Sequence, residues 1–174
     1  MYYIVGLGNP GEEYKLSRHS TGRLALADFV KNGEKKKVKV IFPETFMNDS
    51  GKALRPIIKS KKMAERLIVV HDDLDLGLGK FKISFGSSSA GHKGVESVIK
   101  NIKTKDFIRI RVGISPLTPS GKIKKPEGKK VVEHILNNFK PKELEILKKT
   151  SKKITLALES IIGEGLSKAM SLYN

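Results

Sequence analysis

Apolar residues along the chain form two kinds of pattern. Five short runs rich in β-branched and aromatic residues predict strands at residues 2–7, 38–42, 66–70, 80–85 and 107–114. Apolar residues at helical spacing predict helices that begin at Ser20 or Thr21, cover 50–58 and 95–102, and run from Pro141 to Gly163 or Gly165, with a short last helix around 170–172. Because strands and helices alternate, we expect an α/β fold with a twisted, mostly parallel or mixed sheet flanked by helices.

The length of 174 residues predicts a single domain over 1–174. Pro56 is expected to kink or end the helix over 50–58. Three prolines and two glycines within residues 115–130 favour a flexible basic loop there. No apolar run approaches the roughly 20 residues of a membrane span. The first residues enter a strand directly without a leader pattern, so we expect a cytoplasmic protein with no membrane contact.

The charge of the chain favours an anionic partner. Thirty-four Lys and Arg stand against eighteen Asp and Glu, which gives a formal net charge of +16. A polyanion such as nucleic acid would offset this self-repulsion, and the lysines gather at 35–39 and 122–130. Growth temperature or genome composition also produces lysine-rich surfaces, so charge alone leaves both explanations open. The chain has no cysteine, which excludes thiol nucleophiles and Cys-ligated zinc.

Polar residues that could bind a ligand or take part in catalysis follow the predicted strands. Asn9 follows the first strand, Asn48 the second, Asp72 the third, and His92 and Lys93 the fourth. In open α/β sheets, ligands bind at the edge formed by the carboxyl ends of the strands. We therefore expect these residues to converge in one cleft.

Three motifs suggest other functions and are less consistent with the sequence. Residues 6–11 fit G-x-G-x-x-G, but the charged segment after them does not open an apolar-faced helix, so we expect no dinucleotide cofactor. The serines at 87–89 lack the second glycine of G-x-S-x-G, although a serine esterase remains an alternative; we interpret this loop as an anion cradle before a helix. Asp72, Asp73 and Asp75 suggest a divalent cation, but no glycine-punctuated ligand loop surrounds them, so we expect no metal.

Five segments, in this order, resemble the bacterial-type peptidyl-tRNA hydrolases: IVGLGNPGEEYKLSRHSTG (4–22), FMNDSG (46–51), HDDLD (71–75), GSSSAGHKG (86–94) and IRIRVGI (108–114). The resemblance implies a monomer that hydrolyses the ester between a peptide and the terminal ribose of tRNA, with peptidyl-tRNA and the tRNA phosphate backbone as partners. It implies catalysis by His19 and Asp72, substrate contacts by Asn9, Tyr14, Met47, Asn48, His92 and Lys93, and tRNA contacts by Arg111 and Lys82.

The chemistry of an ester hydrolase agrees with these assignments. Such an enzyme needs a base that takes a proton from water and a group that orients this base. His19, with an ordinary pKa near ~6.5, suits the first role, and Asp72 would hold its second nitrogen. Lys93 stands where the family usually has asparagine, and a nearby ammonium would lower the pKa of His19. This departure and a shortened 23–45 segment favour one alternative, a non-catalytic RNA-binding relative.

Overall fold

The computed structural model describes residues 1–31 and 37–174, and it contains a five-stranded mixed sheet. The strand order is β2-β1-β3-β5-β4. The four strands that pair in parallel are β1 (Tyr2–Gly6), β2 (Val38–Ile41), β3 (Leu67–Gly77) and β5 (Ile108–Ser115). β4 (Phe81–Phe85) pairs antiparallel with β5. The predicted α/β class with a mixed sheet is confirmed. Lys35 and Lys36 of the predicted lysine cluster lie outside the described residues.

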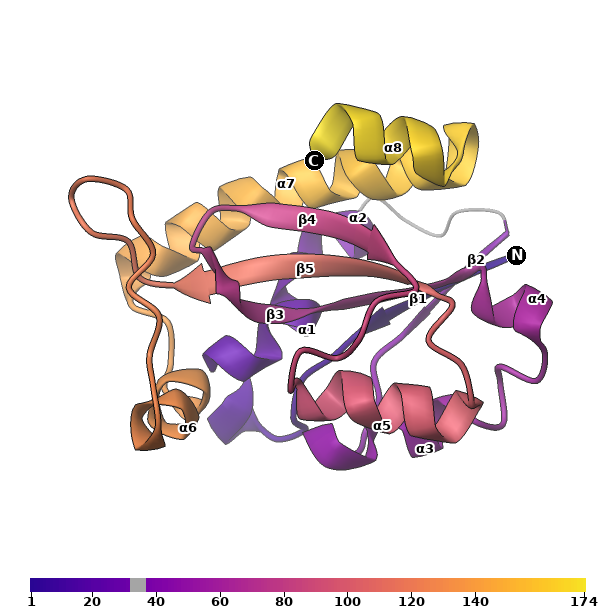
Figure 1. Ribbon diagram of the computed structural model, residues 1–174, viewed down its shortest axis with the longest axis horizontal. Coiled ribbons are helices and arrows are strands. Elements are labelled where there is room, and N and C mark those ends of the chain that lie inside the picture. The colour runs from indigo at the N-terminus through magenta and orange to yellow at the C-terminus, as the bar shows by residue number, and fades with distance from the viewer. Residues whose placement is uncertain (32–36) are drawn as a thin grey trace.

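Helices cover both faces of the sheet and enclose two apolar cores (Figure 1). One core packs β-strand residues such as Ile68 and Val70 against α1 (Thr21–Ala25), α2 (Ala27–Lys31), α7 (Pro141–Glu164) and α8 (Leu166–Tyr173). The other packs Leu67 and Val69 against α3 (Ser50–Leu54) and α5 (Lys93–Ile102). Because side chains alternate along β3, this one strand supplies both cores, as expected for a strand buried on both faces.

Several boundaries differ from the predicted ones. The helix expected from residue 20 is interrupted at Leu26 and forms α1 and α2. The helix expected over 50–58 ends at Leu54, two residues before Pro56, which has no N–H to continue the helical hydrogen bonds. Two short helices were missed, namely α4 (Lys61–Ala64) and α6 (Lys129–Leu136). Residues 116–128 form no helix or strand and contain an isolated bridge between Leu117 and Ile123.

The prediction that polar site residues follow the ends of parallel strands is wrong for β3 and β4. β3 does not end before Asp72 but continues to Gly77, because residues 71–73 pair with Arg111, Val112 and Gly113 of β5. β4 runs antiparallel, so its carboxyl end at Phe85 pairs with Ile108, at the opposite edge of the sheet. Segment 86–92 returns from that edge to the start of α5, which brings His92 back to the carboxyl ends of the parallel strands (Figure 1).

Among the described residues, no helix is both long and apolar enough to cross a lipid bilayer.

Candidate active site

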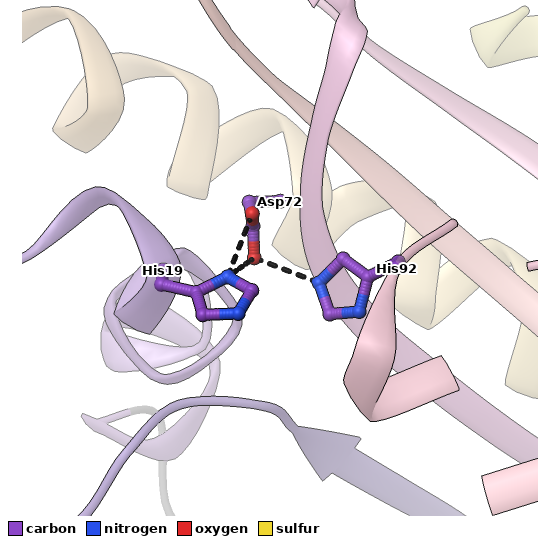
Figure 2. A group of neighbouring side chains, drawn as sticks. All are labelled: His19, Asp72 and His92. Carbon is purple, nitrogen blue, oxygen red and sulfur yellow. Dashed lines mark hydrogen bonds and ion pairs between the residues drawn. The ribbon is translucent and has the colours of Figure 1, made fainter. Parts of the chain in front are cut away.

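The centre of the site is a hydrogen-bonded pair between His19 and Asp72. His19 lies in the single 3₁₀ turn η2 (Arg18–Ser20), and Asp72 lies within β3. The His19 Nδ1 atom lies 2.9 Å from Asp72 Oδ2 and 3.0 Å from Oδ1 (Figure 2). An ionised carboxylate only accepts hydrogen bonds, so Nδ1 carries the proton. In the neutral imidazole, Nε2 then has a free lone pair, which is the state that a general base requires.

His92 approaches the same carboxylate from the other side. Its Nε2 lies 2.9 Å from Asp72 Oδ1, and its Nδ1 accepts a hydrogen bond of 3.3 Å from the backbone N–H of Val95 at the start of α5 (Figure 2). Because Nδ1 is the acceptor, Nε2 carries the proton and donates to Asp72. Both nitrogens of His92 are therefore engaged, so this histidine orients the carboxylate rather than taking a proton from water.

The charges of this cluster shift the pKa values of its members. Burial raises the pKa of the Asp72 carboxyl, but the charges of His19 and His92 and their hydrogen bonds outweigh this and hold its pKa well below its ordinary value. Burial lowers the pKa of His19, but the charge of Asp72 and its hydrogen bond raise that pKa above 6.5 overall. Asp72 therefore stays ionised across the neutral range and stabilises the imidazolium form of His19.

The pair opens into a cleft of about 290 Å³. His19, Asp72 and His92 line it together with residues of α6, the 86–92 segment and the loop before α6. Leu74, Val131 and Ile135 give it an apolar side. His19 is 7% exposed, so the ring is packed without being sealed from solvent.

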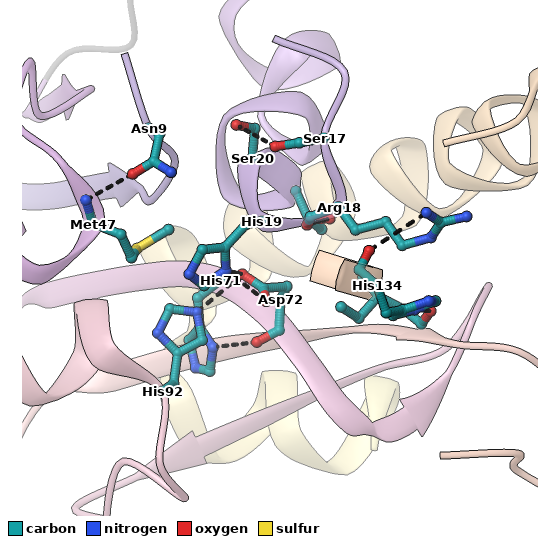
Figure 3. A network of polar contacts seen from close by, with 12 residues as sticks. Asn9, Ser17, Arg18, His19, Ser20, Met47, His71, Asp72, His92 and His134 are labelled. Atoms are coloured by element: carbon teal, nitrogen blue, oxygen red, sulfur yellow. Dashed lines mark hydrogen bonds and ion pairs between the residues drawn. The ribbon is translucent and has the colours of Figure 1, made fainter. Parts of the chain in front are cut away.

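The predicted substrate residues at the end of β1 and β2 form a neighbouring group. The Asn9 Oδ1 atom accepts a hydrogen bond of 2.7 Å from the backbone N–H of Met47, which fixes the 3₁₀ turn η3 (Met47–Asp49) beside β1 (Figure 3). Met47 is 5% exposed, and Asn48 is exposed on the same turn. Tyr14 contacts Phe46 edge to face, with ring centroids 6.5 Å apart. None of these four predicted residues lines the 290 Å³ cleft.

Lys93 lines the cleft but does not bond to the catalytic pair. Its exposed ammonium forms an ion pair of 3.2 Å with Glu96, one turn further along α5. The expectation that Lys93 lowers the pKa of His19 is wrong, because the pKa of His19 is raised and the charge that shifts it is that of Asp72. The Glu96 carboxylate compensates the ammonium locally.

The predicted tRNA-binding residues share one face of the sheet. Lys82 is exposed on β4 and pairs in register with Arg111 of β5. The Arg111 Nε atom donates to Asp73 Oδ2 over 2.7 Å. Arg109 was not predicted as a site residue. It precedes Arg111 by two residues on β5, so its side chain points to the same face of the sheet. Arg109 is 3% exposed, and its Nε has no hydrogen-bond partner among the described residues. The alternation of Arg and Ile in IRIRVGI is the signal that could have identified it.

His71 was also missed as part of the site. It is 1% exposed, its Nδ1 donates to the Asp72 carbonyl oxygen over 2.7 Å, and its ring meets that of His92 edge to face with centroids 4.7 Å apart. Burial and the charge of His92 hold the pKa of His71 well below 6.5, so it is neutral and packs against His92. No feature of the HDDLD segment in the sequence pointed to this role.

The cluster has the composition of a transition-metal site, since one donor atom each of His19, Asp72 and His92 lies within 4.8 Å of the others. The hydrogen bonds between these residues account for the same arrangement. Asp73 and Asp75, the other carboxylates of the suggested cation site, already pair with Arg111 and Lys125. The absence of a metal and of a cofactor stays a prediction.

An α/β sheet that carries an oriented imidazole and a buried carboxylate at an open cleft has the geometry of an enzyme site with a histidine available for general acid–base chemistry. Comparison with known proteins identifies the family. The family model described as peptidyl-tRNA hydrolase matches residues 3–174. The chain therefore belongs to the peptidyl-tRNA hydrolase family.

Individual relatives are similar over almost their whole length. The peptidyl-tRNA hydrolase of Thermodesulfovibrio yellowstonii is 40% identical over 197 residues, which cover 100% of this chain and 99% of the relative. That of Fervidobacterium nodosum is also 40% identical, with 98% and 94% covered. The crystal structure of peptidyl-tRNA hydrolase from Acinetobacter baumannii has a TM-score of 0.84 at 25% identity and covers 100% of this chain and 94% of its own.

Proposed function

We propose that this chain hydrolyses the ester bond between the peptide and tRNA of peptidyl-tRNA, with His19 as the general base. The observation that carries this proposal is the contact between His19 Nδ1 and Asp72, which leaves Nε2 of His19 unprotonated beside the cleft. The family supports the substrate, and the geometry supports the role of the residues.

The reaction proceeds by attack of water on the ester carbonyl carbon. His19 Nε2 takes a proton from this water as the new C–O bond forms. The tetrahedral intermediate then collapses, the bond between the carbonyl carbon and the ribose oxygen breaks, and the imidazolium returns its proton to that oxygen. The products are a free tRNA hydroxyl and a peptide carboxylic acid, which releases its proton to solvent and becomes a carboxylate. Asp72 remains ionised throughout and stabilises the imidazolium between the two proton transfers.

The remaining predicted residues position the substrate in this proposal. Met47 and Asn48 lie on the turn η3, which Asn9 holds beside β1. In this proposal the side-chain amide of Asn48 donates a hydrogen bond to the substrate. In this proposal Tyr14, which packs against Phe46, and His92, which lines the cleft, also contact the substrate. Lys82 and Arg111 contact phosphates of tRNA, which position the substrate without reading its bases. The working unit is a monomer in the cytoplasm.

The serine-esterase alternative lacks the geometry of an activated nucleophile. The Ser87 hydroxyl donates to the Phe85 carbonyl over 3.4 Å, and the Ser89 hydroxyl donates to Glu96 over 3.3 Å. A nucleophilic serine requires a base within hydrogen-bonding distance. Among the described residues, no hydrogen bond joins the hydroxyl group of Ser87, Ser88 or Ser89 to a histidine ring.

Cleavage of an N-acylated aminoacyl-tRNA, compared with the free aminoacyl-tRNA, tests the function. We expect cleavage of the first and little of the second. His19→Ala should lose activity by about a factor of 10² to 10⁴, the usual contribution of a general base, while Ser88→Ala should keep it. Binding of the N-acylated tRNA without cleavage would instead establish the non-catalytic RNA-binding relative. Cleavage that survives in His19→Ala and is lost in Ser88→Ala would establish the serine esterase.

A further inference from the structure

Helix α6 forms one wall of the cleft although it is weakly packed. Val131 and Ile135 of α6 line the cleft, yet none of its eight residues is buried. Ile135 is only partly buried against the core that contains Ile68 and Val70, so apolar packing alone does not fix the position of α6. Its last carbonyl groups also lack partners within the helix and need donors from elsewhere.

Arg18 supplies those donors. Its Nη1 lies 3.5 Å from the carbonyl oxygen of His134 in α6 (Figure 3). The same atom lies 3.2 Å from the carbonyl oxygen of Asn137, the residue directly after α6, and 3.0 Å from that of Asn138. The positive charge also faces the carboxyl end of the helix dipole, which is the favourable orientation. The other terminal nitrogen, Nη2, donates to Glu143 Oε2 of α7 over 2.7 Å.

Arg18 is well fixed in this position. Its side chain is 7% exposed, and its guanidinium carbon lies 5.3 Å from the centroid of the Phe139 ring. Its backbone N–H donates to the Asn137 carbonyl oxygen over 3.1 Å, and its own carbonyl accepts from Thr21 Oγ1 over 2.6 Å. The backbone and the side chain of Arg18 thus both bind the segment that leaves α6.

The residue that follows Arg18 is His19, and both lie in η2, whose three residues are all buried. The strand-like contact continues on the other side of Arg18, where Ser17 forms a bridge with Asn138. The turn that carries the proposed base and the carboxyl end of the cleft wall are therefore joined through Arg18.

We infer that Arg18 is a positioning residue that holds the α6 wall of the cleft against η2 and thereby sets the affinity for the substrate. The inference rests on the proposed function, since it assigns the cleft to peptidyl-tRNA. Arg18 acts through α6 and leaves the His19–Asp72 hydrogen bonds unchanged. Loss of its guanidinium therefore weakens substrate binding more than the chemical step, which appears as a higher KM at a nearly unchanged kcat.

The test compares Arg18→Gln, Arg18→Lys and Glu143→Gln. Arg18→Gln removes the charged donors at the α6 carbonyls, and we expect KM to rise about tenfold, as for loss of one charge-assisted hydrogen bond. The kcat should stay within about a factor of two, and the pH at the midpoint of its acid limb should not move. Arg18→Lys keeps a cationic donor and should recover part of the loss. Glu143→Gln is the matched control, because it removes the ion pair with Arg18 and leaves the contacts to α6, so its KM should stay near that of the wild type.

Hydrogen exchange of the amides of residues 129–136 gives a second readout that does not depend on activity. These amides should exchange faster in Arg18→Gln than in the wild type and remain unchanged in Glu143→Gln. His134→Ala provides a variant if Arg18→Gln does not fold, because the His134 Nε2 atom forms the other polar tether of α6, at 3.0 Å from the Ile114 carbonyl oxygen. It should raise both KM and the exchange rate.

An unchanged KM in the folded Arg18 and His134 variants would overturn the inference, as would an equal rise in KM in Glu143→Gln. Unchanged exchange in 129–136 would overturn it as well. If the wild type does not cleave peptidyl-tRNA, the proposed function fails, while the exchange data still decide whether Arg18 holds α6.

Discussion

Replacement of Asp72 by asparagine tests the central pair most directly. The carboxylate accepts one hydrogen bond from His19 Nδ1 and another from His92 Nε2, at distances of 2.9 to 3.0 Å. In an asparagine the amide oxygen can still accept in place of Oδ1, but the NH₂ group that replaces Oδ2 can only donate. This NH₂ group would face the Nδ1–H of His19 at 2.9 Å, and it therefore favours the tautomer of His19 with the proton on Nε2. That tautomer cannot take a proton from water.

The size and the pH dependence of the effect follow from the same contacts. Loss of oriented base catalysis lowers kcat/KM by about 10² to 10⁴. In the wild type, activity should rise with pH through a midpoint above 6.5, because the base is the unprotonated imidazole and its pKa is raised by Asp72. Without this charge, burial lowers the pKa of His19, so the midpoint of the remaining activity should move to lower pH.

The assay is kcat/KM for an N-acylated aminoacyl-tRNA at a series of pH values and constant ionic strength. Asp106→Asn is the matched control, since Asp106 is exposed in the connection between α5 and β5, and its activity should equal that of the wild type. Two results would refute the reasoning: an Asp72→Asn enzyme within tenfold of the wild type, or an acid limb that keeps its midpoint in this variant.

Three further predictions concern binding and stability. Lys82→Gln should weaken tRNA binding and reduce the slope of log K against log salt by about 0.7 to 0.9, the contribution of one phosphate contact, while Lys142→Gln on the first turn of α7 should leave the slope unchanged; equal slopes in all three proteins would contradict a contact by Lys82. Gly22→Ala should destabilise the fold by more than about 3 kcal/mol, because a Cβ at Gly22 would lie 2.2 Å from a backbone carbonyl oxygen of β3. Gly163→Ala has open space within helix α7 and should stabilise the fold by about 0.5 to 1 kcal/mol. Thermal or denaturant unfolding measures both effects. Because the pKa of Asp72 is lowered in the folded state, its carboxylate stabilises the fold fully above about pH 3.8, and this stabilisation is lost as the pH falls through the folded pKa. The stability of Asp72→Asn should therefore depend less on pH in this acidic range. The same pH dependence in both proteins would count against a buried carboxylate.

The fold class could be predicted from the sequence because each strand shows its own apolar pattern, but strand ends and direction could not. The HDDLD segment is polar and gives no strand signal, yet its backbone pairs with β5 and extends β3 to Gly77. The direction of β4 depends on its pairing with β5, to which its own sequence contributes little. Chain direction within a sheet is a tertiary property, so the alternation of elements predicted a mostly parallel or mixed sheet but could not indicate which strand is antiparallel.

Helix α6 was not predicted for a different reason. Val131, Val132, Ile135 and Leu136 have helical spacing and could have indicated it, but proline and glycine in the preceding loop dominated the interpretation of this region. No residue of α6 is buried, so its apolar face could indicate a helix but not where that helix packs. Its position is set instead by contacts such as those of Arg18, which no local pattern reveals.

The site was partly predictable. The pairing of His19 with Asp72 followed from the chemistry of a general base and was found in the structure at hydrogen-bonding distance. The bond between His92 and Asp72 was not predicted, because it requires segment 86–92 to return across the sheet. The bond of Asn9 to the Met47 backbone was also missed, since an asparagine after a strand gives no indication of its partner.

The shared carboxylate of Asp72 joins parts of the chain that are 53 and 20 residues away, one in a short turn before α1 and the other at the start of α5. Neither histidine can form its hydrogen bond with Asp72 until the helices have packed on both faces of the sheet and the three central strands are paired in register. Recovery of hydrolysis after dilution from denaturant should therefore lag behind the return of secondary structure. In this molecule, enzymatic turnover would serve as a reporter of the last long-range contacts made during refolding.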